Sequence, residues 1–431
     1  MTLVCGHDAH PYGPPLCAHL RAAAATDYFL RYTGAGLSTE HVCEACRDGG
    51  SAATERVCEE CFDDALGSVL GVAGAPETVE APRPLDPTVD STPLPGHAGK
   101  VVDMAPTERG LLLLCADGRL LLWDAPGDDC AEVGRSSVAP DAAAEPWCGR
   151  SQTRRLHASS DGRFAAVVID YGRHGEVIDL TRGAVTRSLE NDGYHSDTVP
   201  FSLAFTTLGE RQAVLYRERW NRIVVCDPAT GETLTTTPTG AEDAPWNSCF
   251  HGALLPSPKG TRIASDAWQW HPVGSVLVWD LPAWPAGGED ARPGPAGWSQ
   301  LALCDYYWDR PLAWLDENRL AIGGLGDDEQ TLVNGATVYE FTGAGDARRV
   351  ATGAFPGPYG RFFAADGLLF STGESGLDVW DPVEGARTGS VPGFRPTHQD
   401  PRTGELLQLD AHAGVVRGWH AGRARAETPG A

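Results

Sequence analysis

Short aliphatic strands that end in an aromatic residue and an acid recur along most of this 431-residue chain, and this repetition restricts its possible folds more than any other feature. Seven such strand ends are recognisable, at residues 120–124, 177–179, 223–227, 276–280, 337–340, 377–381 and 415–420. They are separated by roughly 40 to 60 residues, the length of a four-stranded sheet with variable loops. One such sheet cannot bury both of its faces, whereas seven sheets packed radially bury them all. The pattern therefore predicts an all-β chain, folded as a seven-bladed β-propeller.

The first repeat unit carries a family signature. It begins with Gly96-His97, contains the turn sequence Ala116-Asp117-Gly118 and ends with Trp123-Asp124. The same terminal dipeptide recurs as Trp279-Asp280 and Trp380-Asp381. In these features the chain resembles WD-repeat proteins from about residue 96 to about residue 420. The resemblance implies a WD-like propeller domain over residues 96–424.

The later units depart from the WD pattern. They lack the Gly-His pair, Cys226 stands where Trp is expected, and Tyr339-Glu340 replaces Trp-Asp. These departures argue against close kinship with eukaryotic WD-repeat proteins and favour a protein of bacterial type. The composition agrees, because two Met residues against 51 Gly and 32 Pro are typical of high-GC genomes such as those of actinobacteria.

The seventh unit is short of an outer strand. Residues 405–409 and 414–419 alternate as strands do, but only an Ala- and Arg-rich tail follows them, of which we expect residues 425–431 to be flexible. Residues 71–95, before the first unit, are rich in proline, which excludes a helix and favours an extended linker. Within this linker, the stretch from Thr88 to Leu94 is our candidate for the missing strand. It would close the ring and tie the linker to it.

The N-terminal region has a different character, because six of the twelve cysteines lie in its first 61 residues. Four ligand pairs are present: two C-x-H pairs, Cys5/His7 and Cys17/His19, and two C-x-x-C turns, Cys43/Cys46 and Cys58/Cys61. A C-x-x-C turn lets two thiolates reach one ion, and two pairs complete a tetrahedral zinc shell. Acidic residues within both turns disfavour the low thiol pKa of redox-active motifs. The sequence predicts a Cys/His zinc-binding module in residues 1–70, with one or two structural zinc ions.

The four pairs leave two ways of building two zinc sites. Sequential pairing puts Cys5, His7, Cys17 and His19 in one site and the four later cysteines in the other. Cross-brace pairing joins the first pair to the third and the second to the fourth. The spacing does not choose between them, although the all-Cys site is the firmer prediction. With a strand at residues 27–33 and a helix at residues 62–70, the module resembles treble-clef or cross-brace zinc fingers, whose closed ligand shell makes the zinc structural.

The charge of the chain excludes some partners. The formal net charge is −24, from 58 acidic and 34 basic residues, and no run of Lys and Arg forms a basic face. Phosphate backbones and anionic membrane surfaces are therefore disfavoured. The N-terminus lacks the basic and apolar regions of a secretory signal, and no stretch has the roughly 18 apolar residues of a membrane span. We expect a cytoplasmic protein with reduced thiols.

Aromatic residues gather in the segments that precede several of the repeat strands. Trp, Tyr and Arg dominate interface hot spots, so loops that share one face of the ring would form a surface for a protein or peptide. The candidate binding residues are Trp268, Trp270, His271, Tyr306, Tyr307, Trp308 and Arg310. The sequence therefore favours a non-enzymatic protein-interaction scaffold.

The alternative is a small-molecule binder or hydrolase that acts at the central channel. Its candidate groups are carboxylates and a histidine, at Asp266, His271, Asp305, Asp309, Asp327 and Asp328. No nucleotide-binding, zinc-protease or serine-hydrolase motif is present, so the sequence assigns no catalytic residue. A buried His–carboxylate pair at the channel mouth would favour this alternative, and an exposed aromatic patch would favour the scaffold.

Overall fold

The computed structural model describes residues 15–22, 29–33, 38–43, 45–46, 54–56, 88–124, 129–141, 150–236, 249–269, 273–281, 298–326, 328, 332–343 and 346–421. Within these ranges the chain is almost entirely β-structure, and its one helix has four residues. No helix in the described ranges is long and apolar enough to span a membrane.

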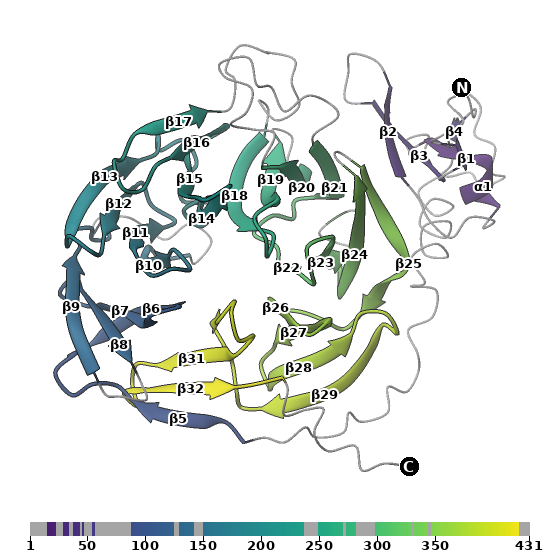
Figure 1. Cartoon of the computed structure of the whole chain (residues 1–431). Helices are drawn as coiled ribbons and strands as arrows, with labels where there is room; N and C mark the ends of the chain where they lie inside the picture. The colour runs from purple at the N-terminus through teal and green to yellow at the C-terminus, as the bar shows by residue number, and fades with distance from the viewer. Residues whose placement is uncertain are drawn as a thin grey trace.

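Seven four-stranded antiparallel sheets are arranged around a centre, as the sequence predicted (Figure 1). Blade 1 is β6(Val101–Thr107), β7(Gly110–Cys115), β8(Arg119–Asp124) and β9(Asp129–Arg135); blade 2 is β10(Thr153–Ala158), β11(Phe164–Asp170), β12(His174–Asp179) and β13(Ala184–Glu190). Blade 3 is β14(Leu203–Leu208), β15(Arg211–Arg219), β16(Arg222–Cys226) and β17(Thr233–Thr236); blade 4 is β18(Cys249–Pro256), β19(Arg262–Gln269), β20(Val273–Asp280) and β21(Trp298–Asp305). Blade 5 is β22(Leu312–Trp314), β23(Arg319–Leu325), β24(Val333–Gly343) and β25(Asp346–Pro356); blade 6 is β26(Arg361–Ala365), β27(Leu368–Thr372), β28(Gly376–Asp381) and β29(Ala386–Pro392).

The seventh blade combines the two ends of the propeller. It contains β30(His398–Gln399), β31(Leu406–Asp410), β32(Val415–Trp419) and, as its outer strand, β5(Asp90–Pro93) from the linker. β5 pairs antiparallel with β32, with Val415 opposite Pro93 and Gly418 opposite Asp90. The stretch proposed from the sequence thus forms the fourth strand, and the ring is closed by hydrogen bonds between segments more than 300 residues apart.

The hydrophobic core is divided among the interfaces between neighbouring blades. Seven clusters of buried side chains join the blades in pairs, and the last joins blade 7 to blade 1. In that last cluster Leu407 and Val416 of blade 7 pack with Met104 and Trp123 of blade 1. Each sheet therefore buries both faces, which a single blade could not do.

The acid that ends many strands organises the turn that follows. At the end of β16, a carboxylate oxygen of Asp227 accepts hydrogen bonds from the backbone N–H groups of Ala229 and Thr230. The turn ends at Gly231, whose φ of 75° favours glycine and whose N–H donates to the Asp227 carbonyl at 2.8 Å. Asp381, at the end of β28, accepts from two N–H groups in the same way. Turn geometry therefore explains the repeated acid.

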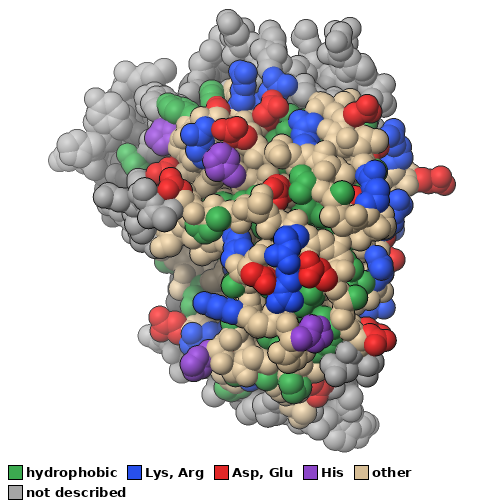
Figure 2. Space-filling model, turned by 90° about the vertical axis from the view of Figure 1, so that its left-hand side faces the viewer, with side chains coloured by type: hydrophobic (Ala, Val, Ile, Leu, Met, Phe, Trp, Pro, Cys, Tyr) green, Lys and Arg blue, Asp and Glu red, His purple; other side chains and the backbone are tan. Residues whose placement is uncertain are grey.

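Charges are interspersed on the rim of the ring. Figure 2 shows one side of the molecule, where basic and acidic side chains lie next to one another. Pairs such as Arg211 with Asp227, 2.8 Å apart, and Arg135 with Glu132, 3.2 Å apart, are examples among the described residues. Exposed pairs of this kind add little stability. On the side shown, they leave no concentrated basic face for a phosphate backbone.

A small eighth sheet precedes the propeller. It contains β1(Pro15–Cys17), β2(Phe29–Thr33), β3(Ser38–Val42) and β4(Thr54–Arg56) in the order β2-β3-β1-β4, with α1(Ala18–Arg21) directly after β1. β1 runs parallel to β3, with Leu16 opposite His41, and antiparallel to β4. The strand expected at residues 27–33 is present as β2. The helix expected at residues 62–70 lies outside the described residues.

Candidate metal centre, aromatic cluster and central pocket

The N-terminal sheet brings four potential metal ligands together. Cys17, His19, Cys43 and Cys46 each direct one ligand atom to a common point, and all four atoms lie within 4.8 Å of one another. Nδ1 of His19 is 3.1 Å from Sγ of Cys46 and 3.5 Å from Sγ of Cys43. Ligands of a tetrahedral zinc with bonds near 2.3 Å are separated by roughly 3.8 Å, so the group fits this geometry. The three cysteines are buried and the histidine is exposed, which leaves the thiols shielded from solvent.

The topology of the N-terminal sheet explains why these four ligands meet. Their combination differs from both predicted pairings of the ligand pairs. β1 ends at Cys17 and the parallel strand β3 ends just before Cys43, so the two cysteines meet at the same edge of the sheet. The N–H of Cys43 donates to Sγ of Cys17 at 3.4 Å. The second ligand pair thus joins the third, a combination that neither sequential nor cross-brace pairing contains. The other predicted ligands, Cys5, His7, Cys58 and Cys61, lie outside the described residues.

An aromatic cluster lies on blades 3 and 4 and on the loops that lead into blades 3 and 5. We use this name for Tyr194, His195, Trp220, Phe250, Trp268 and Trp308. Phe250 and Trp268 are buried and stacked at the centre, with ring centroids 3.9 Å apart. Trp308 stacks on the outside of Trp268 at 5.3 Å, and Trp220 lies 4.5 Å from Phe250. Tyr194 is 46% exposed, so a rigid buried centre supports an accessible aromatic edge.

The candidate binding residues fall into different environments. Trp268 belongs to the buried centre of the aromatic cluster, and Trp308 is half-buried at its edge. Tyr306 is 54% exposed, whereas Tyr307 lines a pocket at the centre of the ring. Trp270 and His271 lie outside the described residues. The predicted surface is thus divided between an aromatic cluster and a central pocket.

Arg310 is buried, so it does not belong to an exposed binding face as the sequence suggested. Its Nε lies 3.4 Å from Oδ1 of Asp266, and both side chains are 2% exposed or less. Asp266 also accepts hydrogen bonds from the backbone N–H groups of Asp309 and Arg310. Arg310 in turn donates to the carbonyls of Ala302 and Tyr307. This pair anchors the loop between β21 and β22 from beneath.

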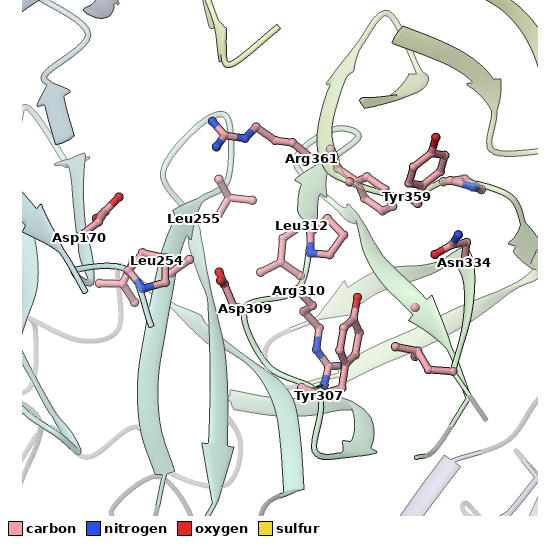
Figure 3. A pocket seen from close by; sticks show the side chains of 18 of the residues that line it. Asp170, Leu254, Leu255, Tyr307, Asp309, Arg310, Leu312, Asn334, Tyr359 and Arg361 are labelled. Atoms are coloured by element: carbon pink, nitrogen blue, oxygen red, sulfur yellow. Dashed lines mark hydrogen bonds between the residues drawn. The ribbon is translucent and has the colours of Figure 1, made fainter. Parts of the chain in front are cut away.

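The central pocket has a volume of about 560 Å³ and is lined by residues of blades 2, 4, 5 and 6 and of the loops that precede blades 3, 5 and 6 (Figure 3). Arg155 of β10 bridges two carboxylates: its Nε is 3.1 Å from Asp170, and its Nη1 is 3.6 Å from Asp103 of blade 1. Nε2 of His398 in blade 7 approaches Asp103 to 3.1 Å. Burial opposes ionisation of Asp103, but His398 and Arg155 hold the pKa of its carboxyl below the usual range.

A second polar group occupies the rim of the pocket. Asp309 lies 3.3 Å from Arg150 and accepts a hydrogen bond of 3.1 Å from the Tyr171 hydroxyl. Burial raises the pKa of Asp309, although Arg150 and the hydroxyl oppose this effect. Burial, together with Asp309, raises the pKa of Tyr171 to about 12. Tyr171 and Asp309 both have φ near 59°, a conformation uncommon outside glycine, so their positions are held by the surrounding structure.

The sequence named some of these groups and missed others. Asp266 and Asp309 were among the carboxylates considered for the channel, and they do lie near one another. The backbones of Asp305 and Asp328 form an isolated parallel β-bridge, and Asp327 and His271 lie outside the described residues. Arg155, Asp103, His398 and Arg361 were missed, because each is a single polar residue on an innermost strand with no motif around it. A charged residue within the first strand of a blade is the only local signal that they offer.

The described residues thus form a seven-bladed β-propeller, preceded by a small four-stranded module that carries the Cys/His cluster. No family model matches the chain, and no curated protein matches it. Among solved structures, it is similar to a chain of the mitotic checkpoint complex, with 14% identity and a TM-score of 0.48, over 81% of this chain and 96% of that one. It is also similar to the β-propeller domain of Cps50 (Swd1) from Myceliophteria thermophila, with 12% identity and a TM-score of 0.40, over 65% of this chain and 83% of that one. These likenesses assign no activity or partner to this chain.

Proposed function

We propose that this protein is a non-enzymatic interaction scaffold that binds a protein or peptide partner through the aromatic cluster. The observation that carries the proposal is the stack of Phe250, Trp268 and Trp308, with Tyr194 exposed beside it. Buried rings at the centre fix the positions of the outer rings, so binding would order few side chains. Aromatic residues in this arrangement are enriched among interface hot spots.

The surroundings of the cluster support the same function. The ring holds the loops that carry the cluster on packed sheets of blades 3, 4 and 5. We propose the cytoplasm as the location, because the Cys/His cluster needs reduced thiols to hold a metal ion.

The test is affinity purification of the tagged protein from its native cell, followed by binding measurements with the purified partner. Trp308→Ala removes the outer ring of the stack and should weaken binding by about 30-fold or more, as expected for a hot-spot side chain worth about 2 kcal/mol. Val383→Ala is the matched control, because Val383 is 52% exposed and lies outside the cluster. It should leave binding unchanged.

Two results would contradict the scaffold function. One is a protein that purifies from its cell without a stoichiometric partner. The other is a partner that binds the Trp308→Ala variant as tightly as it binds wild type. Thermal unfolding of both variants should be compared, since Trp308 is only partly buried and its removal should leave the fold intact.

We further propose that Cys17, His19, Cys43 and Cys46 bind a structural zinc ion. Three thiolates and one imidazole suit zinc, and with four protein ligands no coordination position stays open for substrate. Zinc would then supply folding energy to a module whose described elements have five residues or fewer. The remaining predicted ligands, Cys5, His7, Cys58 and Cys61, would form a second site, in a combination that neither predicted pairing contained.

The zinc content of the purified chain tests this assignment. Cys43→Ser should remove one zinc ion per chain, whereas Cys304→Ser, which changes a buried propeller cysteine, should remove none. Cys61→Ser should remove a different ion if the second site exists. An unchanged zinc content in the Cys43→Ser variant would refute the centre described here.

A further inference from the structure

The central pocket contains an arginine, Arg361, that forms no ion pair with a carboxylate of the described residues. Arg361 is the first residue of β26, the innermost strand of blade 6, and its side chain projects across the pocket toward Leu255 (Figure 3). The acceptor of its guanidinium among the described residues is the backbone oxygen of Thr397, at 2.8 Å from Nη1. No described carboxylate lies within 4 Å of it, and Arg155 is the strongest charge that acts on it.

The environment of Arg361 is crowded but open to solvent. Burial lowers the pKa of Arg361, and repulsion from Arg155 lowers it further. The residue is nevertheless exposed, because its accessible surface faces the cavity. A guanidinium has five N–H donors, so most of its hydrogen-bonding capacity points into the pocket.

The carboxylates of the pocket are already occupied by other cations. Asp170 and Asp103 share Arg155. Asp309 is paired with Arg150, and Asp266 is paired with Arg310, which itself lines the pocket. Because no described carboxylate lies within ion-pair distance of Arg361, its remaining N–H donors can pair with an acceptor from a ligand.

The apolar part of the pocket wall restricts the kind of anion that could pair with Arg361. Leu255 and Leu312 lie below the guanidinium, and the ring of Tyr307 stands on the same side (Figure 3). An inorganic ion would leave this apolar wall in water, whereas an organic molecule would cover it. A cavity of about 560 Å³ falls in the range that small organic ligands occupy.

We propose that the central pocket binds a small organic anion, whose carboxylate or phosphate group pairs with Arg361 and whose apolar body lies against Leu255, Leu312 and Tyr307. The rim is preorganised for such a ligand, since the hydrogen bond between Tyr171 and Asp309 holds two residues in left-handed backbone conformations. This site is separate from the aromatic cluster and does not depend on the scaffold function.

The experiment uses 2-naphthoate as the probe and its neutral isostere 2-naphthamide as the comparison, each titrated calorimetrically into the full-length protein. The carboxylate should bind at least about tenfold more tightly than the amide, because a charge-assisted bidentate hydrogen bond distinguishes them. Arg361→Gln should abolish that preference. Arg211→Gln, which changes an exposed arginine of blade 3, should retain it, as should Trp220→Ala in the aromatic cluster.

A second measurement covers the case in which Arg361→Gln does not fold. Phenylglyoxal should modify Arg361 in wild-type protein, and 2-naphthoate should protect this residue, as read by peptide mass spectrometry. Equal affinities of the carboxylate and the amide, no binding of the carboxylate at millimolar concentration, or failure to protect Arg361 would each overturn the proposal. Binding of an acidic peptide in the pocket without binding of 2-naphthoate would also overturn it.

Discussion

Deleting residues 86–96 is expected to destabilise the propeller by about 5 kcal/mol or more. The deletion removes β5, and with it the antiparallel pairing of four residues to β32. It also removes Val89 and Leu94, which pack against the core clusters on either side of blade 7. Each partly buried aliphatic side chain contributes roughly 1.5 kcal/mol, and each lost ladder hydrogen bond roughly 1 kcal/mol. The loss approaches the whole stability of an ordinary domain.

Thermal unfolding measures this effect, with a midpoint expected to fall by about 10 °C or more. The control is a deletion of the same length within the linker, residues 72–82, which shortens the chain but leaves β5 in place. The control variant should unfold near the wild-type temperature. If the two deletions behave alike, β5 does not close the ring in solution.

The repeat pattern revealed the fold because it marks one strand position in every blade. All seven strand ends found in the sequence belong to the third strand, from β8 in blade 1 to β32 in blade 7. This strand has a neighbour on each side and is buried on both faces, as in β20, so its apolar run is continuous. Outer strands such as β9 are largely exposed and carry a weaker pattern. The sequence pattern therefore predicts the number of blades, but it does not predict the bounds of their outer strands.

The candidate sites were less accessible to sequence reasoning, because they depend on which strands become neighbours. The ligand spacing identified all four pairs, but Cys17 meets Cys43 only because β1 and β3 are parallel and in register. The pocket combines Arg155 with Arg361, more than 200 residues away, and no local spacing connects them. Turn chemistry, in contrast, is local, and the Asp-to-Gly turn at residues 227–231 was recognisable at once.

Removing Asp266 from its buried pair with Arg310 should lower the unfolding free energy nearly as much as deleting β5. At pH 8.5, where the Asp266 carboxyl is ionised, Asp266→Ala leaves the Arg310 guanidinium buried without a counter-charge and two backbone N–H groups without their acceptor. Breaking a buried pair in this way costs about 3 to 5 kcal/mol. The loop that carries Tyr307 and Asp309 should also loosen, so binding of 2-naphthoate should weaken.

A double-mutant cycle separates the pair from its surroundings. Arg310→Met removes the cation and keeps an unbranched apolar side chain of similar length. If the charges are coupled, Asp266→Ala combined with Arg310→Met should cost at least about 1 kcal/mol less than the sum of the two single changes. Chemical denaturation of the four proteins provides the numbers, and strictly additive losses would show that the two groups do not interact.

The pH dependence of stability provides the sharpest signature of Asp266. Burial raises the pKa of its carboxyl to about 7, against the attraction of Arg310, while the unfolded chain should titrate near its ordinary value of about 3.9. Between about pH 4 and pH 7 the folded protein therefore holds a proton that the unfolded chain has lost, and the contribution of this group to the unfolding free energy falls as pH rises. From about pH 5.5 to pH 8.5, wild type should lose about 2 kcal/mol relative to Asp266→Asn, which cannot titrate. Parallel stability profiles for the two proteins would mean that Asp266 stays ionised throughout and that its pairing with Arg310 outweighs burial.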